Sequence, residues 1–177
     1  DGQVRLVWIG SAATLKYLEG IRTVLQDLAG RFGNLTLRMI SDKYLDAMSI
    51  KTERCRWSRE TEAAHLTASD IGLAPLPDDP FTRGKCGYKI LQYQAAGLPV
   101  VASPVGVNAQ YVRDGVTGFL ARDPAQWVDR LGELIVRPEL RTTLGRAGRR
   151  EVEAFDVSVI GNRLCTLIAE CLGQRKG

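Results

Sequence analysis

Short apolar runs alternate with stretches of helical periodicity along the whole chain, and this alternation restricts the fold more than any other feature. Runs such as VRLVWIG (residues 4–10) and LPVVAS (residues 98–103) are mainly apolar and do not alternate with polar residues, which is typical of strands buried on both faces. Residues 14–31 instead place apolar side chains three and four positions apart, as an amphipathic helix does. The pattern predicts an α/β domain with a doubly wound parallel sheet and helices on both faces.

About six strands follow from this pattern. We predict strands at residues 4–10, 35–41, 51–57, 70–76, 98–103 and 118–121. Charged residues alternate in the third of these runs, so we expect it nearer an edge of the sheet. We predict helices at residues 14–31, 58–68, 85–96, 108–114, 126–136, 138–155 and 157–172, with a loop at residues 77–84. The prediction is a single domain, residues 1–177, that ends in a C-terminal helix over residues 156–173 with Asp156 as its cap.

Composition excludes several classes of protein. The chain has 177 residues, and 45% of them are hydrophobic, which suits one soluble globular domain and excludes a disordered chain. Its four cysteines form no CxxC pair and only one histidine accompanies them, so we expect no zinc site, no disulfide scaffold and a reducing cytoplasm. No apolar run approaches the roughly 20 residues of a membrane span, and the polar opening Asp-Gly-Gln is not typical of a signal peptide.

In a doubly wound sheet, ligands bind at the loops that follow the carboxyl ends of the strands. The first such loop begins Gly10-Ser11 and leads to Lys16. It matches neither GxGxxG nor the GxxxxGK[ST] phosphate loop. Its small residues would let a ligand approach the backbone, although a plain tight turn is an equally good interpretation. Lys16 is within reach of a phosphate there, or is simply solvated.

The strongest local signal is TRGKCGYK at residues 82–89. Gly84 and Gly87 give the backbone freedom at the start of the predicted helix, where the amides of Gly87 and Tyr88 would face an anion and the helix dipole favours negative charge. Lys85 and Lys89 are four residues apart, so they would share one face of that helix. A diphosphate would suit this arrangement, and a chance pair of surface lysines is the alternative.

Other candidates give weaker signals. Trp57 and Ser58 come at the end of a predicted strand, where they would stack on a nucleotide base or hydrogen-bond to it, unless Trp57 is a core residue. Glu60 and Glu62 are best interpreted as acids that complement the dipole of the following helix rather than as catalytic groups. The single histidine, His65, is expected on a helix face.

The stretch from residue 70 to residue 121, which contains DIGLAPLPDD, AAGLPVVAS and GVTGFLA, resembles a known family. It is similar to the C-terminal, donor-binding domain of retaining nucleotide-sugar glycosyltransferases of the GT-B fold, in the large group 1 (family 4-like) set. The resemblance implies two Rossmann-like domains that face each other across a cleft, of which this chain is the second. It therefore implies a nucleotide-diphospho-sugar donor, a missing N-terminal acceptor domain and a fragment that is inactive alone. No metal, other cofactor or nucleic acid is expected.

The family's donor contacts carry over unevenly. Two glutamates usually stand eight residues apart before the AxGxPV turn, and those positions hold Gly84 and Gln92 here. Gln92 can still accept a hydrogen bond from a ribose hydroxyl, whereas Gly84 cannot replace a carboxylate that orients the sugar. The family also holds the diphosphate with an arginine and a lysine. No arginine follows the first strand in this sequence, and only Lys16 is present in that loop. The resemblance therefore assigns stabilisation of the leaving diphosphate to Lys85 and Lys89. A non-catalytic module that binds sugar nucleotides or anions is the alternative, and an epimerase is a distant third.

The resemblance also implies acceptors that are lipid-linked or cell-surface glycans. Arginines crowd residues 141–150, and such a basic helix would suit acidic lipid, although a solvated helix explains it better because no apolar anchoring face accompanies it. We expect a cytoplasmic protein, with peripheral association at the inner face of the membrane as the alternative.

Overall fold

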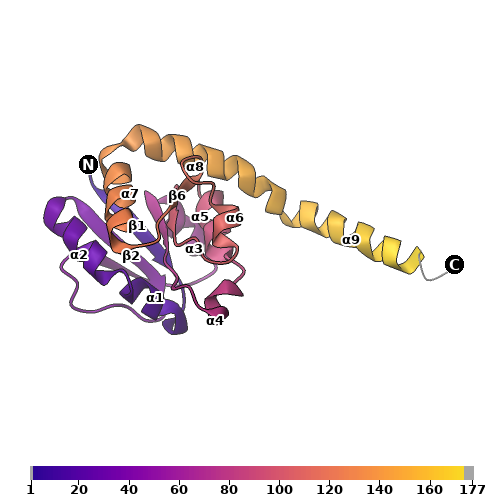
Figure 1. The fold of residues 1–177 in the computed structure, drawn as a ribbon, viewed down its shortest axis with the longest axis horizontal. Coiled ribbons are helices and arrows are strands. Elements are labelled where there is room, and N and C mark those ends of the chain that lie inside the picture. The colour runs from indigo at the N-terminus through magenta and orange to yellow at the C-terminus, as the bar shows by residue number, and fades with distance from the viewer. Residues whose placement is uncertain (1, 174–177) are drawn as a thin grey trace.

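The computed structural model describes residues 2–173 and shows a parallel sheet between two layers of helices (Figure 1). Its six strands lie in the order β3-β2-β1-β4-β5-β6, and every neighbouring pair is parallel. The strands are β1 (Val4–Ile9), β2 (Leu35–Ser41), β3 (Lys51–Arg56), β4 (Ile71–Ala74), β5 (Val100–Ala102) and β6 (Gly118–Leu120). The predicted sheet is confirmed, with its third strand at one edge. Of the predicted domain 1–177, residue 1 and residues 174–177 lie outside the described residues.

Side chains of β1 point alternately into two buried clusters. Leu6 and Trp8 join the cluster that includes side chains of α1 (Leu15–Glu19), α2 (Arg22–Arg31) and α7 (Pro124–Val136). Val7 and Ile9 join the other cluster, which includes side chains of α3 (Glu62–Thr67) and α5 (Tyr88–Ala95). Both faces of the strand are therefore buried, which is the physical reason for its continuous apolar run.

The single helix predicted at residues 14–31 is wrong. The structure has a short 3₁₀ turn (Ala12–Thr14), then α1, then α2. The break falls at Gly20 and Ile21, where Ile21 has φ −112° and ψ 20°. Glycine is a poor helix former, and both short helices still turn leucines toward the same cluster, so the apolar spacing does not reveal the break.

Two more helix boundaries differ from the prediction. The loop predicted at residues 77–84 contains the helix α4 (Pro80–Arg83), because the Asp79 carboxylate accepts a hydrogen bond from the Thr82 amide at 2.8 Å and proline occupies the first turn. An aspartate cap followed by proline is a favourable start for a helix. The prediction was wrong because it treated these proline and aspartate residues as loop formers. The helix predicted to begin at residue 58 begins instead at Glu62, after a turn in which the Thr61 amide donates to the Ser58 hydroxyl.

The C-terminal part of the chain is helical, as predicted. After β5 comes the short α6 (Asn108–Tyr111), which ends before the predicted residue 114. Past β6 and α7, the chain continues through α8 (Pro138–Val152), a 3₁₀ turn (Glu153–Phe155) and α9 (Val157–Gly173). The Asp156 carboxylate accepts a hydrogen bond from the Ser158 amide at 2.9 Å at the start of α9. Figure 1 shows α9 extending away from the sheet.

Two arginines of the basic stretch have structural partners. The Arg141 guanidinium donates to the carbonyls of Leu134 and Ile135 at 2.7 and 3.0 Å, and Arg149 donates to the carbonyl of Ala95. These carbonyls end α7 and α5, where helix geometry leaves acceptors unpaired. Arg141 therefore links α8 to the end of α7, and Arg149 links it to the end of α5. Within residues 2–173, no helix combines the length and the apolar character needed to cross a membrane.

Candidate functional site

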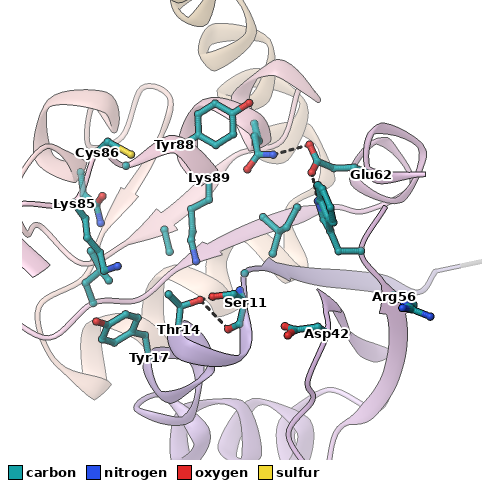
Figure 2. Close-up of a pocket in the computed structure, with 18 residues that line it drawn as sticks. Ser11, Thr14, Tyr17, Asp42, Arg56, Glu62, Lys85, Cys86, Tyr88 and Lys89 are labelled. Atoms are coloured by element: carbon teal, nitrogen blue, oxygen red, sulfur yellow. Dashed lines mark hydrogen bonds between the residues drawn. The ribbon is translucent and has the colours of Figure 1, made fainter. Parts of the chain in front are cut away.

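A pocket of about 920 Å³ lies at the carboxyl ends of the strands (Figure 2). The strand order reverses between β1 and β4, which is where doubly wound sheets form their binding crevice. The two strands pair at Leu6↔Ile71 and Val7↔Gly72. The buried Tyr93 hydroxyl then bridges them: it accepts from the Ile9 amide at 3.0 Å and donates to the Leu73 carbonyl at 3.1 Å.

Most of the residues singled out in the sequence come together around this pocket. Those that line it are Gly10, Ser11, Trp57, Lys85, Gly87, Tyr88, Lys89 and Gln92. They come from the loops after β1, β3 and β4 and from α5. The structure therefore gathers the candidates from three separate loops into one cavity, as expected for the carboxyl edge of a parallel sheet.

Three predicted residues lie elsewhere. Lys16 lines a second, smaller pocket of about 380 Å³. Ser58 lies outside both pockets, and its hydroxyl pairs with that of Thr61 at 2.9 Å. Gly84 also lies outside both and caps the end of α4. The predicted contacts of Ser58 and Gly84 with a ligand therefore have no support in the geometry.

The two lysines do not share a helix face, because α5 begins at Tyr88 and not at residue 85. Gly87 precedes the helix with φ +62°, a left-handed conformation that interrupts it. Lys85 therefore belongs to the preceding turn, yet both lysines line the pocket. The Lys85 ammonium lies 5.3 Å from the ring centroid of Tyr17 and 5.0 Å from that of Phe81.

Lys89 occupies the deeper position. Its ammonium lies 4.8 Å from the ring centroid of the fully buried Trp8, and Figure 2 shows the side chain reaching into the pocket toward the loop of Ser11 and Thr14. Burial, together with the nearby charge of Lys85, lowers the pKa of Lys89 from 10.5 to about 8. The indole face offsets part of the cost of burying the ammonium. At neutral pH the pocket therefore contains a weakly hydrated positive charge.

Keeping Lys89 charged has a cost that depends on pH. Below pH 8, Lys89 is protonated in both states, and the folded chain holds the proton at an unfavourable site. Between pH 8 and 10.5, Lys89 is protonated only in the unfolded chain. The free energy of unfolding therefore rises as the pH increases through this range. We expect Lys89→Met to be more stable than the wild type at pH 7 by roughly 2 kcal/mol, less than the full shift because the pocket admits water. Denaturant titrations at pH 7 and pH 10 check this. An advantage that is equal at both pH values would contradict it.

A hydrogen-bonded cluster forms the opposite wall. The Glu62 carboxylate accepts from the Gln92 side-chain amide at 2.6 Å and from the Trp57 indole N–H. Trp57 is 52% exposed, so the interpretation of it as a core residue is wrong. Sequence reasoning identified Glu62 only as an acid of the first helical turn, which it also is.

Sequence reasoning also missed Asp42, which follows β2 directly and lines the pocket. Its carboxylate accepts from the Ala12 amide at 2.8 Å, and this hydrogen bond is the largest cause of the lowered pKa of Asp42. Arg56, Cys86 and Asn108 line the pocket as well. The rule that loops after parallel strands line the crevice would have found Asp42, because the loop after β2 obeys it too.

Comparisons with known proteins agree on the family. Residues 3–137 match the family model of glycosyl transferases group 1. The D-inositol 3-phosphate glycosyltransferase of Geodermatophilus obscurus is 38% identical over 98 residues, which are 54% of this chain and 20% of that protein. The corresponding enzyme of Thermobispora bispora is 31% identical over 153 residues, which are 85% of this chain and 31% of that protein. The chain therefore spans a fifth to a third of the length of these relatives.

Solved structures share the fold. The C-terminal domain of the group 1 family protein LpcC from Francisella tularensis matches with a TM-score of 0.65 at 15% identity, over 87% of this chain and 85% of that one. Anabaena HepE, solved with UDP and glucose, matches with a TM-score of 0.76 at 17% identity, over 96% of this chain and 49% of that one. Sucrose-phosphate synthase from Thermosynechococcus elongatus matches with a TM-score of 0.77 at 18% identity, over 98% of this chain and 47% of that one. The chain belongs to the group 1 glycosyl transferases, and its six-stranded domain has the fold of one half of a GT-B glycosyltransferase.

Proposed function

We propose that this chain is the donor-binding half of a retaining glycosyltransferase that uses a nucleotide-diphospho-sugar. The observation that carries the proposal is the pocket itself, which has two lysines on one wall and an exposed tryptophan on another. Its volume of about 920 Å³ is at the upper end of the range typical for ligand pockets, roughly 300–1,000 Å³. Cationic and aromatic groups in one cavity suit a ligand with an anionic centre and a flat base at one end.

Each part of such a donor finds suitable chemistry in the pocket. The diphosphate would lie between Lys85 and Lys89, near the first amides of α5, including that of Tyr88. The base would stack on the exposed face of Trp57. The carbonyl oxygen of Gln92 would accept a hydrogen bond from the ribose. Anabaena HepE, which shares this fold, was also solved with UDP-glucose, and that finding supports a donor of this class here.

The domain's part in the reaction would be electrostatic. The bond between the sugar's anomeric carbon and the diphosphate oxygen breaks, and the electron pair stays on the leaving nucleoside diphosphate. Two ammonium groups already in place stabilise that growing negative charge without reorganising. A charge pair about 4 Å apart is worth on the order of 4 kcal/mol at an intermediate dielectric constant.

Isothermal titration calorimetry with UDP, GDP and ADP tests donor binding by this chain. We expect at least one of them to bind, and Lys85→Ala to weaken that binding at least tenfold, since one ammonium contact is lost. In the full-length protein with its acceptor, the same variant should lower turnover at least tenfold. Lys51→Ala is the matched control, because Lys51 is exposed at the start of β3, away from the pocket. No heat with any of the three nucleotides, or unchanged affinity of Lys85→Ala, would contradict the proposal.

A non-catalytic sugar-nucleotide or anion-binding module is the second candidate. It is favoured by Gly84, which brings no carboxylate and lies outside the pocket. Both candidates predict binding of the nucleotide. Only the full-length protein separates them, through transfer of sugar from donor to acceptor or its absence.

The other half of the protein would supply the acceptor site. We propose an N-terminal domain of similar size as the partner across the cleft, and a lipid-linked or glycan acceptor. Such a protein would work in the cytoplasm, where nucleotide sugars are available, and a lipid-linked acceptor would bring it to the inner face of the membrane.

A further inference from the structure

We infer that Glu62 is a positioning residue: it holds the Gln92 amide and the Trp57 indole so that the pocket selects a ribonucleotide by its sugar hydroxyls. The inference rests on the proposed donor binding and deepens it. Glu62 lies at the start of α3, Trp57 directly after β3 and Gln92 on α5. All three line the same pocket, and Figure 2 shows Glu62 with both of its hydrogen bonds.

The direction of both hydrogen bonds is fixed by chemistry. An ionised carboxylate can only accept, and an indole N–H can only donate. One oxygen of Glu62 takes the Trp57 N–H. The other lies 2.6 Å from Gln92 and must receive the amide NH₂ rather than the amide carbonyl. Glu62 therefore fixes the orientation of the Gln92 amide, with its NH₂ group toward Glu62 and its carbonyl oxygen on the other side.

This orientation leaves the carbonyl oxygen of Gln92 as its second polar atom. Because Gln92 lines the pocket, that oxygen is the acceptor that the amide offers a ligand, beside the second hydrogen of its NH₂ group. The partner of this oxygen must therefore be a donor, such as a ribose hydroxyl. A sugar that lacks hydroxyls at the 2′ and 3′ positions offers no donor there.

The same carboxylate limits what Trp57 can do. Its only donor is already used by Glu62, so the base meets the face of the indole and not its N–H. The side chain is 52% exposed, and without this hydrogen bond it would lose its polar anchor. The Glu62 carboxylate thus positions both the Trp57 ring, on which the base would stack, and the Gln92 carbonyl oxygen, which would accept from a ribose hydroxyl.

An exchange of the two side chains tests this role. In Glu62→Gln, the carbonyl oxygen of the new amide accepts from the Trp57 indole, and its NH₂ group then faces Gln92. Gln92 must present its own carbonyl oxygen to that NH₂ group, which turns this oxygen away from the ligand. We expect the affinity for the ribonucleoside diphosphate to fall severalfold, toward that of its 2′,3′-dideoxy counterpart, because the ribose hydroxyls lose their acceptor and keep only a contact with the Gln92 NH₂. The affinity for inorganic pyrophosphate should not change. In the double variant Glu62→Gln/Gln92→Glu, a carboxylate at position 92 accepts from position 62 and keeps a second oxygen for the ribose, so the preference should return.

The measurement is calorimetry on the 177-residue chain with UDP, GDP and ADP, their 2′,3′-dideoxy forms and pyrophosphate. Glu60→Gln is the matched control, since Glu60 is exposed in the turn just before α3 and should leave the ribose preference intact. A Glu62→Gln variant that keeps the full preference for ribose overturns the inference. So does a double variant that fails to regain it, or a parallel loss of pyrophosphate binding. A wild-type chain that binds none of the nucleotides overturns the proposed function, and the inference with it.

Discussion

Lys89→Met should weaken binding of the nucleoside diphosphate at least 100-fold. The Lys89 ammonium lies over the Trp8 ring in a half-buried position, where water screens its attraction to a diphosphate poorly. Loss of about 3 kcal/mol corresponds to a factor of roughly 100–200 in affinity. Methionine keeps the unbranched shape of the side chain and removes only its charge. Calorimetry at pH 7 with the nucleotide that binds best measures the effect.

Two features separate this result from simple misfolding. The variant is expected to be more stable than the wild type at pH 7, because it no longer buries an ammonium group whose pKa is lowered to about 8. A protein that is more stable but binds worse has lost a functional charge rather than its fold. Lys51→Met serves as the control, with no expected change in affinity. Less than a fivefold loss for Lys89→Met would show that the diphosphate does not contact this amine.

Tyr93→Phe should lower the free energy of unfolding by about 3 kcal/mol. The Tyr93 hydroxyl is fully buried, accepts from the Ile9 amide and donates to the Leu73 carbonyl. Its removal leaves a buried donor and a buried acceptor unpaired, at roughly 1–3 kcal/mol each. Burial also raises the pKa of this hydroxyl, so it stays neutral and able to donate. Thermal unfolding of a chain of this length should show a decrease of roughly 6–12 °C.

Tyr44→Phe is the matched control for this effect. The Tyr44 hydroxyl donates to the Ser41 carbonyl at 3.1 Å in a partly buried position, so its loss should cost about 1 kcal/mol or less. Because Tyr93 joins β1 to β4 at the floor of the crevice, its variant should also bind nucleotide less tightly than the control does. Equal stability of the two variants would mean that water replaces the Tyr93 hydroxyl.

Most of the fold was predictable because burial leaves a direct trace in the sequence. The run VRLVWI is apolar since β1 sends side chains into a cluster on each face of the sheet. The helix break at Gly20 left no such trace, because α1 and α2 both bury leucines against the same cluster. The spacing of apolar residues shows which side of a helix is buried. It does not reveal a change in the direction of the helix axis when the same side stays buried.

The candidate site was predictable to the level of its loops. Lys85, Lys89 and Trp57 follow strands whose carboxyl ends must meet at one edge, so their gathering in one pocket follows from topology. The reason given for the lysine pair was wrong, since Gly87 takes a left-handed conformation and α5 begins after Lys85. A glycine is compatible with many conformations, so its identity alone does not fix where a helix begins.

The sequence by itself determined the parallel sheet, the order of its strands along the chain and most of the loops that border the crevice, because these depend on local patterns of burial and on chain connectivity. Only the tertiary structure decided that Glu62 meets Gln92 and Trp57, and that Lys89 lies over Trp8. Such contacts join elements that are distant along the chain, and they depend on how helices are placed on the sheet to within a few ångströms. That placement is a property of the packed core as a whole, and no single segment of the sequence contains it.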